Sequence, residues 1–446
     1  MGPVGLIQQT YSISLDGGRY LIYAPLKKIA FLGNASLVNA IVERCQSPKT
    51  SSAELDFLEN LNFFQPEPFP EDESQHREAR YDATILFLTN QCNLRCTYCY
   101  ASSGENPKKM MIWEIAKAGI DRVMQDVMAH QSPSMTLGFH GGGEPTLNWE
   151  VLTKSVEYAR ALADRHCIRL NVSGAFNGYW QPDVTEYITR NLTDISLSFD
   201  GLPVVQNTQR PAAGNAESFT KVADTLRALD QAQFPYAIRM TVTNETVSYL
   251  ADSVALICEQ FHPRKIQVEP VFEEGRARKN RLTMTDLNTF MSQFIRAYAI
   301  TEGHQIPLLY SGGRLEVLND RFCLAACRAL IVTPDGDVTT CFEIYDREHP
   351  LSQHFVVGKY QGNGGFLIDQ EKLSRHLNRT IRALPYCDGC FCKWHCAGDC
   401  AAKTLSKETI NGFQPSERCL VNREVTKFLL LHKIKTGGGV FWANQE

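Results

Sequence analysis

Three cysteines lie close together in the segment Cys92-Asn-Leu-Arg-Cys96-Thr-Tyr-Cys99, with the spacing C-x3-C-x2-C. Thiolates held in one short loop can bind three irons of a [4Fe-4S] cube and leave the fourth iron open to another ligand. Zinc is the alternative metal, but structural zinc sites prefer four ligands and paired C-x2-C segments, and no partner pair lies near this loop. The spacing therefore predicts an iron-sulfur cluster with one open coordination position.

Nine further cysteines lie toward the carboxyl end: Cys323, Cys327, Cys341, Cys387, Cys390, Cys392, Cys396, Cys400 and Cys419. The chain has 15 cysteines in all, and an odd number argues against a fully paired disulfide framework. Clustered thiolates in a reducing compartment are more often metal ligands, although two zinc sites could also use eight of them. Cys45, Cys167 and Cys258 stand alone in apolar or helical surroundings, and we expect them to be buried small side chains.

Strand-like and helix-like segments alternate around the first cysteine loop, which directly follows the first strand. The strand-like segments are 83–89, 135–140, 168–173, 194–200, 236–243 and 265–272, and the helical ones lie near 112–130, 149–166, 182–191, 217–231, 247–261 and 284–302. Such alternation predicts an α/β fold with a parallel sheet and covering helices. Six repeats indicate a partial (β/α)6 barrel with its active groups at the carboxyl ends of the strands.

The flanking regions have different patterns. Residues 11–32 alternate apolar and polar side chains around Asp16-Gly17-Gly18, which predicts a β-hairpin. Helical spacing follows, and residues 65–80 form a polar, proline-containing linker. We therefore expect a small α+β domain at 1–80, the barrel at 81–305, a cysteine-rich domain at 306–430 and a tail at 431–446.

Composition limits the function further. Of the 446 residues 43% are hydrophobic and 21% are charged, and the formal net charge is -4. This composition is ordinary for a globular protein. The negative net charge does not indicate the basic surface that binding of nucleic acid requires. No apolar run approaches a membrane span, and residues 1–10 lack the features of a secretory signal. We therefore expect a cytoplasmic protein that binds neither nucleic acid nor membranes.

The cysteine loop, its place after the first strand and the aromatic Tyr98 before its last cysteine resemble the radical S-adenosylmethionine superfamily. The second strand ends in Phe139-His-Gly-Gly-Gly-Glu144-Pro145, which resembles the Gly-Gly-Glu-Pro motif of that family. The resemblance implies that Tyr98, Gly142, Gly143 and Glu144 bind S-adenosylmethionine, with glycine backbone and a carboxylate receiving its methionyl ammonium. The third glycine leaves open which of them makes the backbone contact.

The fourth strand ends in Ser196-Leu-Ser198-Phe-Asp200-Gly201, and Arg210 follows twelve residues after Ser198. This pattern resembles the peptide-modifying branch of the superfamily and implies that Ser198 and Arg210 contact the cofactor. An arginine can hold a carboxylate through two hydrogen bonds. The resemblance further implies that the cofactor is cleaved to a 5'-deoxyadenosyl radical, which takes a hydrogen atom from the substrate.

The carboxyl-terminal cysteines, with Gly336 before Cys341, resemble the SPASM domain pattern. That resemblance implies two auxiliary clusters, held by Cys323, Cys327, Cys341 and Cys400 and by Cys387, Cys390, Cys396 and Cys419. Cys392 is an alternative ligand to Cys327. Together with the first loop, the chain would hold three [4Fe-4S] clusters, and the auxiliary pair would carry electrons.

SPASM enzymes mostly act on peptides or proteins, so the resemblance implies a peptide or protein maturase. A thioether or carbon-carbon crosslink in a ribosomally made peptide is the preferred product. Formylglycine formation in a sulfatase is the alternative, although Phe342 and Glu343 follow Cys341 where that group has an aspartate. An iron-sulfur electron carrier or a peptide-binding module without radical chemistry is the alternative of another class.

Residues 1–80 look loosely like the leader-recognition elements of peptide maturases, which can bind a leader by strand addition. A purely structural role for these residues is the alternative. The resemblance also implies a reductant such as flavodoxin or ferredoxin. No residue is assigned a catalytic role.

Overall fold

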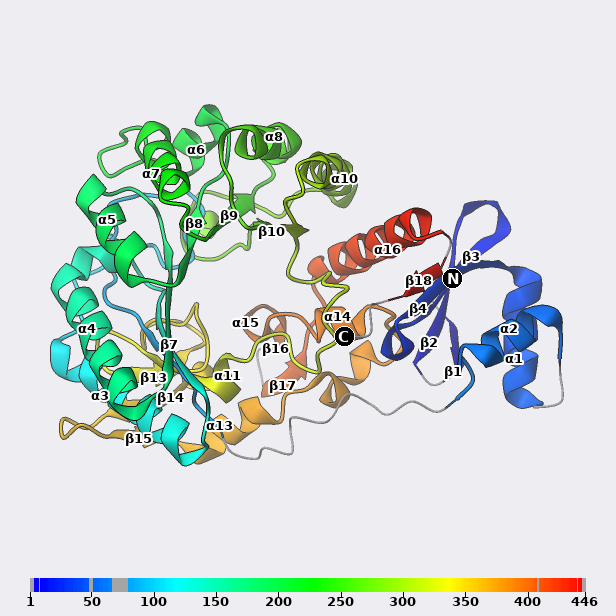
Figure 1. Cartoon of the computed structure of the whole chain (residues 1–446), viewed down its shortest axis with the longest axis horizontal. Helices are drawn as coiled ribbons and strands as arrows, with labels where there is room; N and C mark the ends of the chain where they lie inside the picture. Colours follow the sequence, from blue (N-terminus) through cyan, green and yellow to red (C-terminus); the bar gives the residue numbers. More distant parts are fainter. Residues whose placement is uncertain are drawn as a thin grey trace. The chain divides into compact units, whose positions relative to one another are not determined.

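The computed structural model describes residues 4–7, 9–47, 51–65, 79–406, 409–438 and 440–442. It divides into two compact units, each built from segments that are distant in sequence (Figure 1). The barrel unit comprises His76–Tyr310 and Cys323–Leu377. The terminal unit comprises Met1–Gln75, Ser311–Phe322 and Asn378–Glu446. Most of the expected linker at 65–80 lies outside the described residues.

Parallel strands form the centre of the barrel unit, in the order β10-β9-β8-β7-β6-β5. Their bounds are β5 Ala83–Leu86, β6 Ser134–Phe139, β7 Arg169–Phe176, β8 Asp194–Ser198, β9 Tyr236–Val242 and β10 Ile266–Pro270. The short β11 Leu308–Leu309 continues the sheet beyond β10. The predicted α/β fold with a parallel sheet is therefore confirmed.

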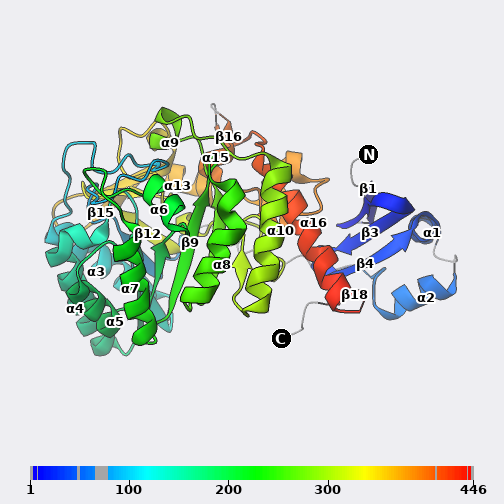
Figure 2. The same ribbon diagram turned by 90° about the horizontal axis from the view of Figure 1, so that it is seen from above.

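Helices alternate with these strands and form an outer layer over them (Figure 2). They are α3 Trp113–Ala129, α4 Trp149–His166, α5 Pro182–Asn191, α6 Pro203–Gln209, α7 Phe219–Gln231, α8 Leu250–Gln260, α9 Arg276–Lys279 and α10 Leu287–Gly303. Apolar residues at helical spacing explain the packing: in α4, Leu152, Val156 and Ala159 are fully buried. The helix ends where Cys167 adopts a left-handed conformation, with φ 54°.

The cysteine-rich region contributes to the barrel sheet rather than forming one separate domain. After α11 Ala325–Arg328, strand β12 Ala329–Val332 pairs in parallel with β5 on the side opposite β6. Antiparallel strands β13 Asp337–Thr339, β14 Val356–Tyr360 and β15 Phe366–Ile368 extend the sheet. Helices α12 Ser352–Phe355 and α13 Gln370–Leu377 complete the unit. This difference from the expected boundary at 306 follows from strand pairing across a long stretch of sequence.

A five-stranded antiparallel sheet organises the terminal unit, in the order β1-β2-β3-β4-β18. The strands are β1 Val4–Ile7, β2 Thr10–Ser14, β3 Arg19–Ala24, β4 Ile29–Asn34 and β18 Val440–Trp442. The expected hairpin is β2 and β3, joined through Gly17 and Gly18 with φ 72° and 71°. Glycine adopts such positive φ angles without steric cost.

Two helices follow β4 in the sequence, α1 Ala35–Gln46 and α2 Ala53–Asn60. The unit is completed by α14 Lys393–Cys396, α15 Ala401–Thr404, β16 Leu405–Ser406, β17 Thr409–Phe413 and α16 Arg418–Thr436. The Asn34 and Ser52 side chains accept hydrogen bonds from backbone N–H groups and cap the first two helices. Where a tail was expected, at 431–446, the structure has the end of α16 and the strand β18, which pairs with β4. None of the helices in the described ranges combines the length and apolar content needed to cross a membrane.

Candidate functional site: a three-cysteine loop and a glycine loop

The first cysteine loop follows β5 at the carboxyl end of the sheet. Cys92, Cys96 and Cys99 pack in one cluster with Leu94 and Tyr98. Backbone hydrogen bonds from Arg95 N to Pro211 O (2.7 Å) and from Thr97 N to Gln209 O (2.8 Å) fix the loop. The structure therefore brings the three predicted thiolates together.

The surroundings of the Cys92 and Cys99 sulfurs differ. Burial, followed by the nearby Cys96 and Glu144, raises the pKa of Cys92 to about 12. Burial would likewise raise the pKa of Cys99, but hydrogen bonds with Ser103 and Arg276 hold it below its usual value. A metal-bound thiolate needs such compensation, because an unpaired charge in a buried site is costly.

The glycine loop after β6 lies directly against the residues that precede Cys92. A Cβ atom on Gly143 would lie 2.2 Å from the carbonyl oxygen of Gln91, so only glycine fits there. Glu144 N donates a hydrogen bond to the same oxygen at 2.8 Å. Gly142 has φ 57°, and its carbonyl oxygen accepts a hydrogen bond from Ser103 Oγ. The expected Gly142, Gly143 and Glu144 therefore lie beside the cysteine loop.

Glu144 is a buried carboxylate with only 2% exposure. Its oxygens accept hydrogen bonds from Thr146 Oγ1 (2.9 Å) and Asn177 N (2.8 Å). Burial raises the pKa of Glu144 to about 7, although these hydrogen bonds and Arg210 act against the rise. Within the described residues no cation forms an ion pair with it. A bound ammonium group would therefore stabilise its ionised form.

A buried polar network connects Tyr98, Asp200 and Arg210. Arg210 Nη1 donates to Tyr98 Oη at 2.6 Å, and Tyr98 Oη donates to Asp200 Oδ2 at 2.7 Å. Asp200 also accepts from Gln209 Nε2 and from Thr241 N. The Arg210 guanidinium lies near the Cys96 thiol, and its Nε atom has no hydrogen-bond partner in the part of the chain that the structure describes. Ser198, also expected at the site, is half-buried at the end of β8.

These residues fit an iron-sulfur cluster that carries S-adenosylmethionine. Gly142 and Gly143 pack closely against the backbone of Thr89 and Gln91, and among the described residues the buried Glu144 carboxylate forms no ion pair. The buried Nε atoms of Arg210 and Arg276 offer unused donors close to the thiols. In the described ranges no three His, Cys, Asp or Glu side chains surround a position for a single metal ion. A cluster of several irons spaces its thiolates more widely than one ion does.

Three of the expected auxiliary ligands belong to the barrel unit. Cys341 is buried, Cys327 is half-buried and Cys323 is exposed. Glu343 N donates a hydrogen bond to Cys341 Sγ at 3.5 Å. Cys400, the fourth member of this set, belongs to the terminal unit.

The second auxiliary set lies entirely within the terminal unit. Burial, followed by the nearby Cys390 and Cys419, raises the pKa of Cys387 to about 12. Burial, followed by Asp399 and then by the other thiols of the set, raises the pKa of Cys396. Asn422 Nδ2 donates to Cys396 Sγ at 3.1 Å.

Cys392 accompanies this set, with its sulfur 3.3 Å from that of Cys390. The hydrogen bond from Cys392 lowers the pKa of Cys390 to about 6, while the pKa of Cys392 is raised. Cys390 is therefore the anionic member of the pair.

The isolated cysteines were only partly as expected. Cys258 is buried, but Cys45 and Cys167 are exposed. Both exposed residues lie at the ends of helices, where the apolar side of the helix no longer covers them.

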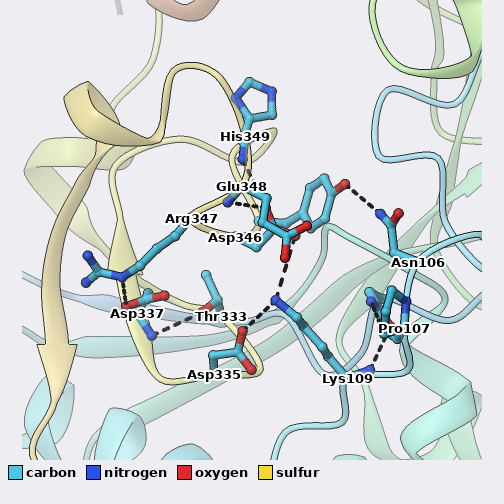
Figure 3. A network of polar contacts seen from close by, with 12 residues as sticks. Asn106, Pro107, Lys109, Thr333, Asp335, Asp337, Asp346, Arg347, Glu348 and His349 are labelled. Carbon is cyan, nitrogen blue, oxygen red and sulfur yellow. Dashed lines mark hydrogen bonds and ion pairs between the residues drawn. The ribbon is translucent and has the colours of Figure 1, made fainter.

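A network of polar contacts that the sequence did not indicate joins residues 106–109, which follow the cysteine loop, to residues 333–349 (Figure 3). Lys109 Nζ lies 2.8 Å from Asp335 and 3.9 Å from the buried Asp346. Asn106 Nδ2 donates to Tyr345 Oη at 3.4 Å, and Tyr345 Oη donates to Ala101 O at 2.9 Å. These contacts join residues distant in sequence, so no local pattern could predict them.

Comparison with known proteins agrees with this geometry. The family model described as "Radical SAM superfamily" matches residues 86–257. The sporulation killing factor maturation protein SkfB of Bacillus subtilis is 25% identical over 259 residues, which span 57% of this chain and 59% of that relative, little more than half its length. A cysteine-type anaerobic sulfatase-maturating enzyme of Clostridium perfringens is 23% identical over 347 residues, 71% of this chain and 88% of that enzyme.

Among solved structures, native anSMEcpe with bound AdoMet has a TM-score of 0.62 and 16% identity, covering 80% of this chain and 99% of that one. This likeness shows a shared fold. The family match runs from the last residue of β5 into α8 and includes the cysteine loop, the glycine loop and Arg210. Residues 86–257 therefore form a radical SAM domain.

Proposed function

We propose that the chain is a radical SAM maturase that oxidatively modifies a peptide or protein, with a thioether or carbon-carbon crosslink in a ribosomally made peptide as its product. The observation that carries the proposal is the clustering of three cysteines in one loop, with the glycine loop packed against the backbone just before Cys92. At Gly143 any side chain would overlap that backbone. The maturation proteins among its relatives support a peptide or protein substrate.

In this proposal Cys92, Cys96 and Cys99 hold three irons of the first cluster. The cluster together with S-adenosylmethionine would supply the radical that takes a hydrogen atom from the substrate. Gly142, Gly143 and Glu144 receive the methionyl ammonium, because Glu144 is a buried carboxylate that forms no ion pair within the described residues. Burial of these groups also keeps water away from the reacting atoms.

Ser198 and Arg210 complete the cofactor site. Tyr98 acts mainly as a positioning residue, because its hydroxyl bridges Arg210 and Asp200. The bridge holds the Arg210 guanidinium beside Cys96, where its charge offsets the negative charge of the thiolates.

Two further sets of cysteines would hold auxiliary clusters, which would supply electron transfer between the active site and a redox partner such as flavodoxin or ferredoxin. One uses Cys323, Cys327, Cys341 and Cys400, and the other uses Cys387, Cys390, Cys396 and Cys419. The low pKa of Cys390 favours this residue over Cys392 as the ligand of the second cluster. The hydrogen bond from Asn422 to Cys396 is of the kind that adjusts the potential of a cluster.

The sheet of the terminal unit recognises a leader peptide by strand addition. The strand β1 lies at one edge of this sheet, and backbone groups on such an edge can pair with an extended peptide.

Sulfatase maturation to formylglycine is a second candidate, favoured by relatives such as the Clostridium perfringens enzyme. Glu343, whose N–H contacts the Cys341 sulfur, would then replace the aspartate that follows this cysteine in that group. An electron carrier or peptide-binding module without radical chemistry is the candidate of another class.

The test is dithionite-dependent release of 5'-deoxyadenosine by anaerobically reconstituted protein, with Cys96→Ala as the disabled variant and Cys258→Ala as the matched control. We expect about twelve irons per chain and release by the wild type and the control only. A fully iron-loaded wild type that releases no 5'-deoxyadenosine would refute radical chemistry. Mass spectrometry of a sulfatase peptide against a precursor peptide then separates the first two candidates.

A further inference from the structure

Arg239 occupies an unusual position in the middle of β9. Its sequence neighbours Ile238 and Met240 are buried under the helices, whereas Arg239 itself is exposed. Successive side chains of a strand point to opposite faces, so Arg239 lies on the face of the sheet away from Ile238 and Met240.

Strand register places Arg239 beside the cofactor site. Its Cα atom is paired with that of Ser198 on β8 and with that of Gln267 on β10. Residues in register on adjacent parallel strands share a face. Arg239 therefore shares its face with Ser198, a proposed cofactor contact.

The surroundings confirm that Arg239 reaches the active end of the barrel. Its positive charge acts on Tyr100, the residue after Cys99, and on His140, the residue before the glycine loop. Burial, with Arg239 as the second cause, lowers the pKa of His140 to about 4, so that side chain is neutral at physiological pH. Glu343 lies near both groups as well. Arg239 thus stands among groups drawn from the cysteine loop, the glycine loop and the Cys341 segment.

Arg239 differs from the other two arginines near this site. Arg210 is buried and bonded to Tyr98, and Arg276 is buried and paired with Glu105 at 3.2 Å. Among the described residues, the Arg239 side chain forms no hydrogen bond and no ion pair. An unpaired guanidinium on a central strand adds little to folding, but it offers a fork of donors that matches a carboxylate.

We propose that Arg239 binds a carboxylate of the peptide substrate, from an Asp or Glu side chain or a carboxyl terminus, and so determines which residue is presented to the radical. This inference rests on the proposed function. The methionyl carboxylate of S-adenosylmethionine has the same chemistry, and the experiment must distinguish the two sources.

The experiment selects binders from a random peptide library displayed on messenger RNA, in the presence of S-adenosylmethionine. It compares the reconstituted wild type, Arg239→Glu and Arg169→Glu. Arg169 is a matched control, because it is also an exposed arginine on a strand but begins β7 at the opposite end of the sheet. Iron content and peptide-independent release of 5'-deoxyadenosine are measured for all three proteins.

We expect the wild type and Arg169→Glu to enrich peptides with an acidic residue at a fixed position, and Arg239→Glu to lose this preference. Synthetic pairs that differ by Glu against Gln, or by a free against an amidated carboxyl terminus, should differ about 10- to 100-fold in affinity for the wild type. The same pairs should bind Arg239→Gln equally.

Three results would overturn the site while leaving the proposed function intact. The first is an acidic preference that survives in Arg239→Glu, and the second is no acidic preference among wild-type binders. The third is loss of 5'-deoxyadenosine release in Arg239→Glu at limiting S-adenosylmethionine, which would assign Arg239 to the cofactor. A wild type that enriches no peptide would refute the proposed peptide substrate and this site together.

Discussion

The substitution Gly143→Ala tests the contact between the glycine loop and the cysteine loop. The added Cβ would lie 2.2 Å from Gln91 O and 2.8 Å from both Gln91 N and the carbonyl carbon of Asn90. All three are backbone atoms, so no side-chain rotation can relieve the overlap. Restoring an ordinary contact requires a displacement of about 1 Å in the backbone just before Cys92, which should cost about 3 kcal/mol.

A shift of this size should affect both partners of the contact. Cys92 would move relative to the other two thiolates, and Glu144 would lose the 2.8 Å hydrogen bond that its N–H makes to Gln91 O. A misplacement of about 1 Å can lower an enzymatic rate about 100-fold. We therefore expect about 100-fold less 5'-deoxyadenosine release at equal iron content, or loss of iron where the ligand itself is displaced.

The matched control is Gly303→Ala, because a Cβ at that position has no atom within 4 Å. Thermal unfolding, iron analysis and the release assay are compared for the two variants and the wild type. Equal stability and equal release for Gly143→Ala and Gly303→Ala would refute the steric argument and with it the proposed role of this loop.

Three further outcomes are expected. Because burial raises the pKa of Glu144 from 4.5 to about 7, the folded state keeps a proton that the unfolded chain releases, and stability falls as pH rises through this window. In Glu144→Gln, the fall in the free energy of unfolding across this pH window should be roughly 3 kcal/mol smaller than in the wild type. Urea denaturation of the cofactor-free proteins measures this difference, and parallel pH profiles would contradict it. Cys390→Ser should lose about four irons while Cys392→Ser keeps them, and the reverse pattern would make Cys392 the ligand. Tyr23→Phe should lower the free energy of unfolding by about 1–3 kcal/mol, because Tyr23 Oη is hydrogen-bonded to buried His395 Nε2; unchanged denaturation would exclude a structural role for this pair.

Local patterns were sufficient to predict most of the barrel. The alternation of β5 to β10 with their helices, and the hairpin at Asp16–Gly18, are encoded in short stretches of sequence. The pairing of strand β12 with β5 was not predicted. A strand contains no local signal for a partner hundreds of residues away, so the division of the cysteine-rich region between two units could not be predicted.

The site shows the same contrast. The cysteine spacing and the glycine motif indicated Cys92 to Cys99 and Gly142 to Glu144, which the structure packs together. Arg239 was missed, although a charge between the apolar residues of β9 was a usable signal. Lys109 had no such signal, because its partners Asp335 and Asp346 come from a distant segment. Polar networks of this kind depend on tertiary contacts rather than on local spacing.

The pairing of β18 with β4 has a consequence for synthesis of the protein. Four strands of the terminal sheet come from Val4–Asn34, but the fifth becomes available only when Val440–Trp442 has left the ribosome. During translation β4 therefore presents an open edge that invites pairing with other chains. The terminal unit should therefore become resistant to proteases later than the barrel unit during translation. A ribosome stalled before residue 440 should leave a product that is prone to aggregation.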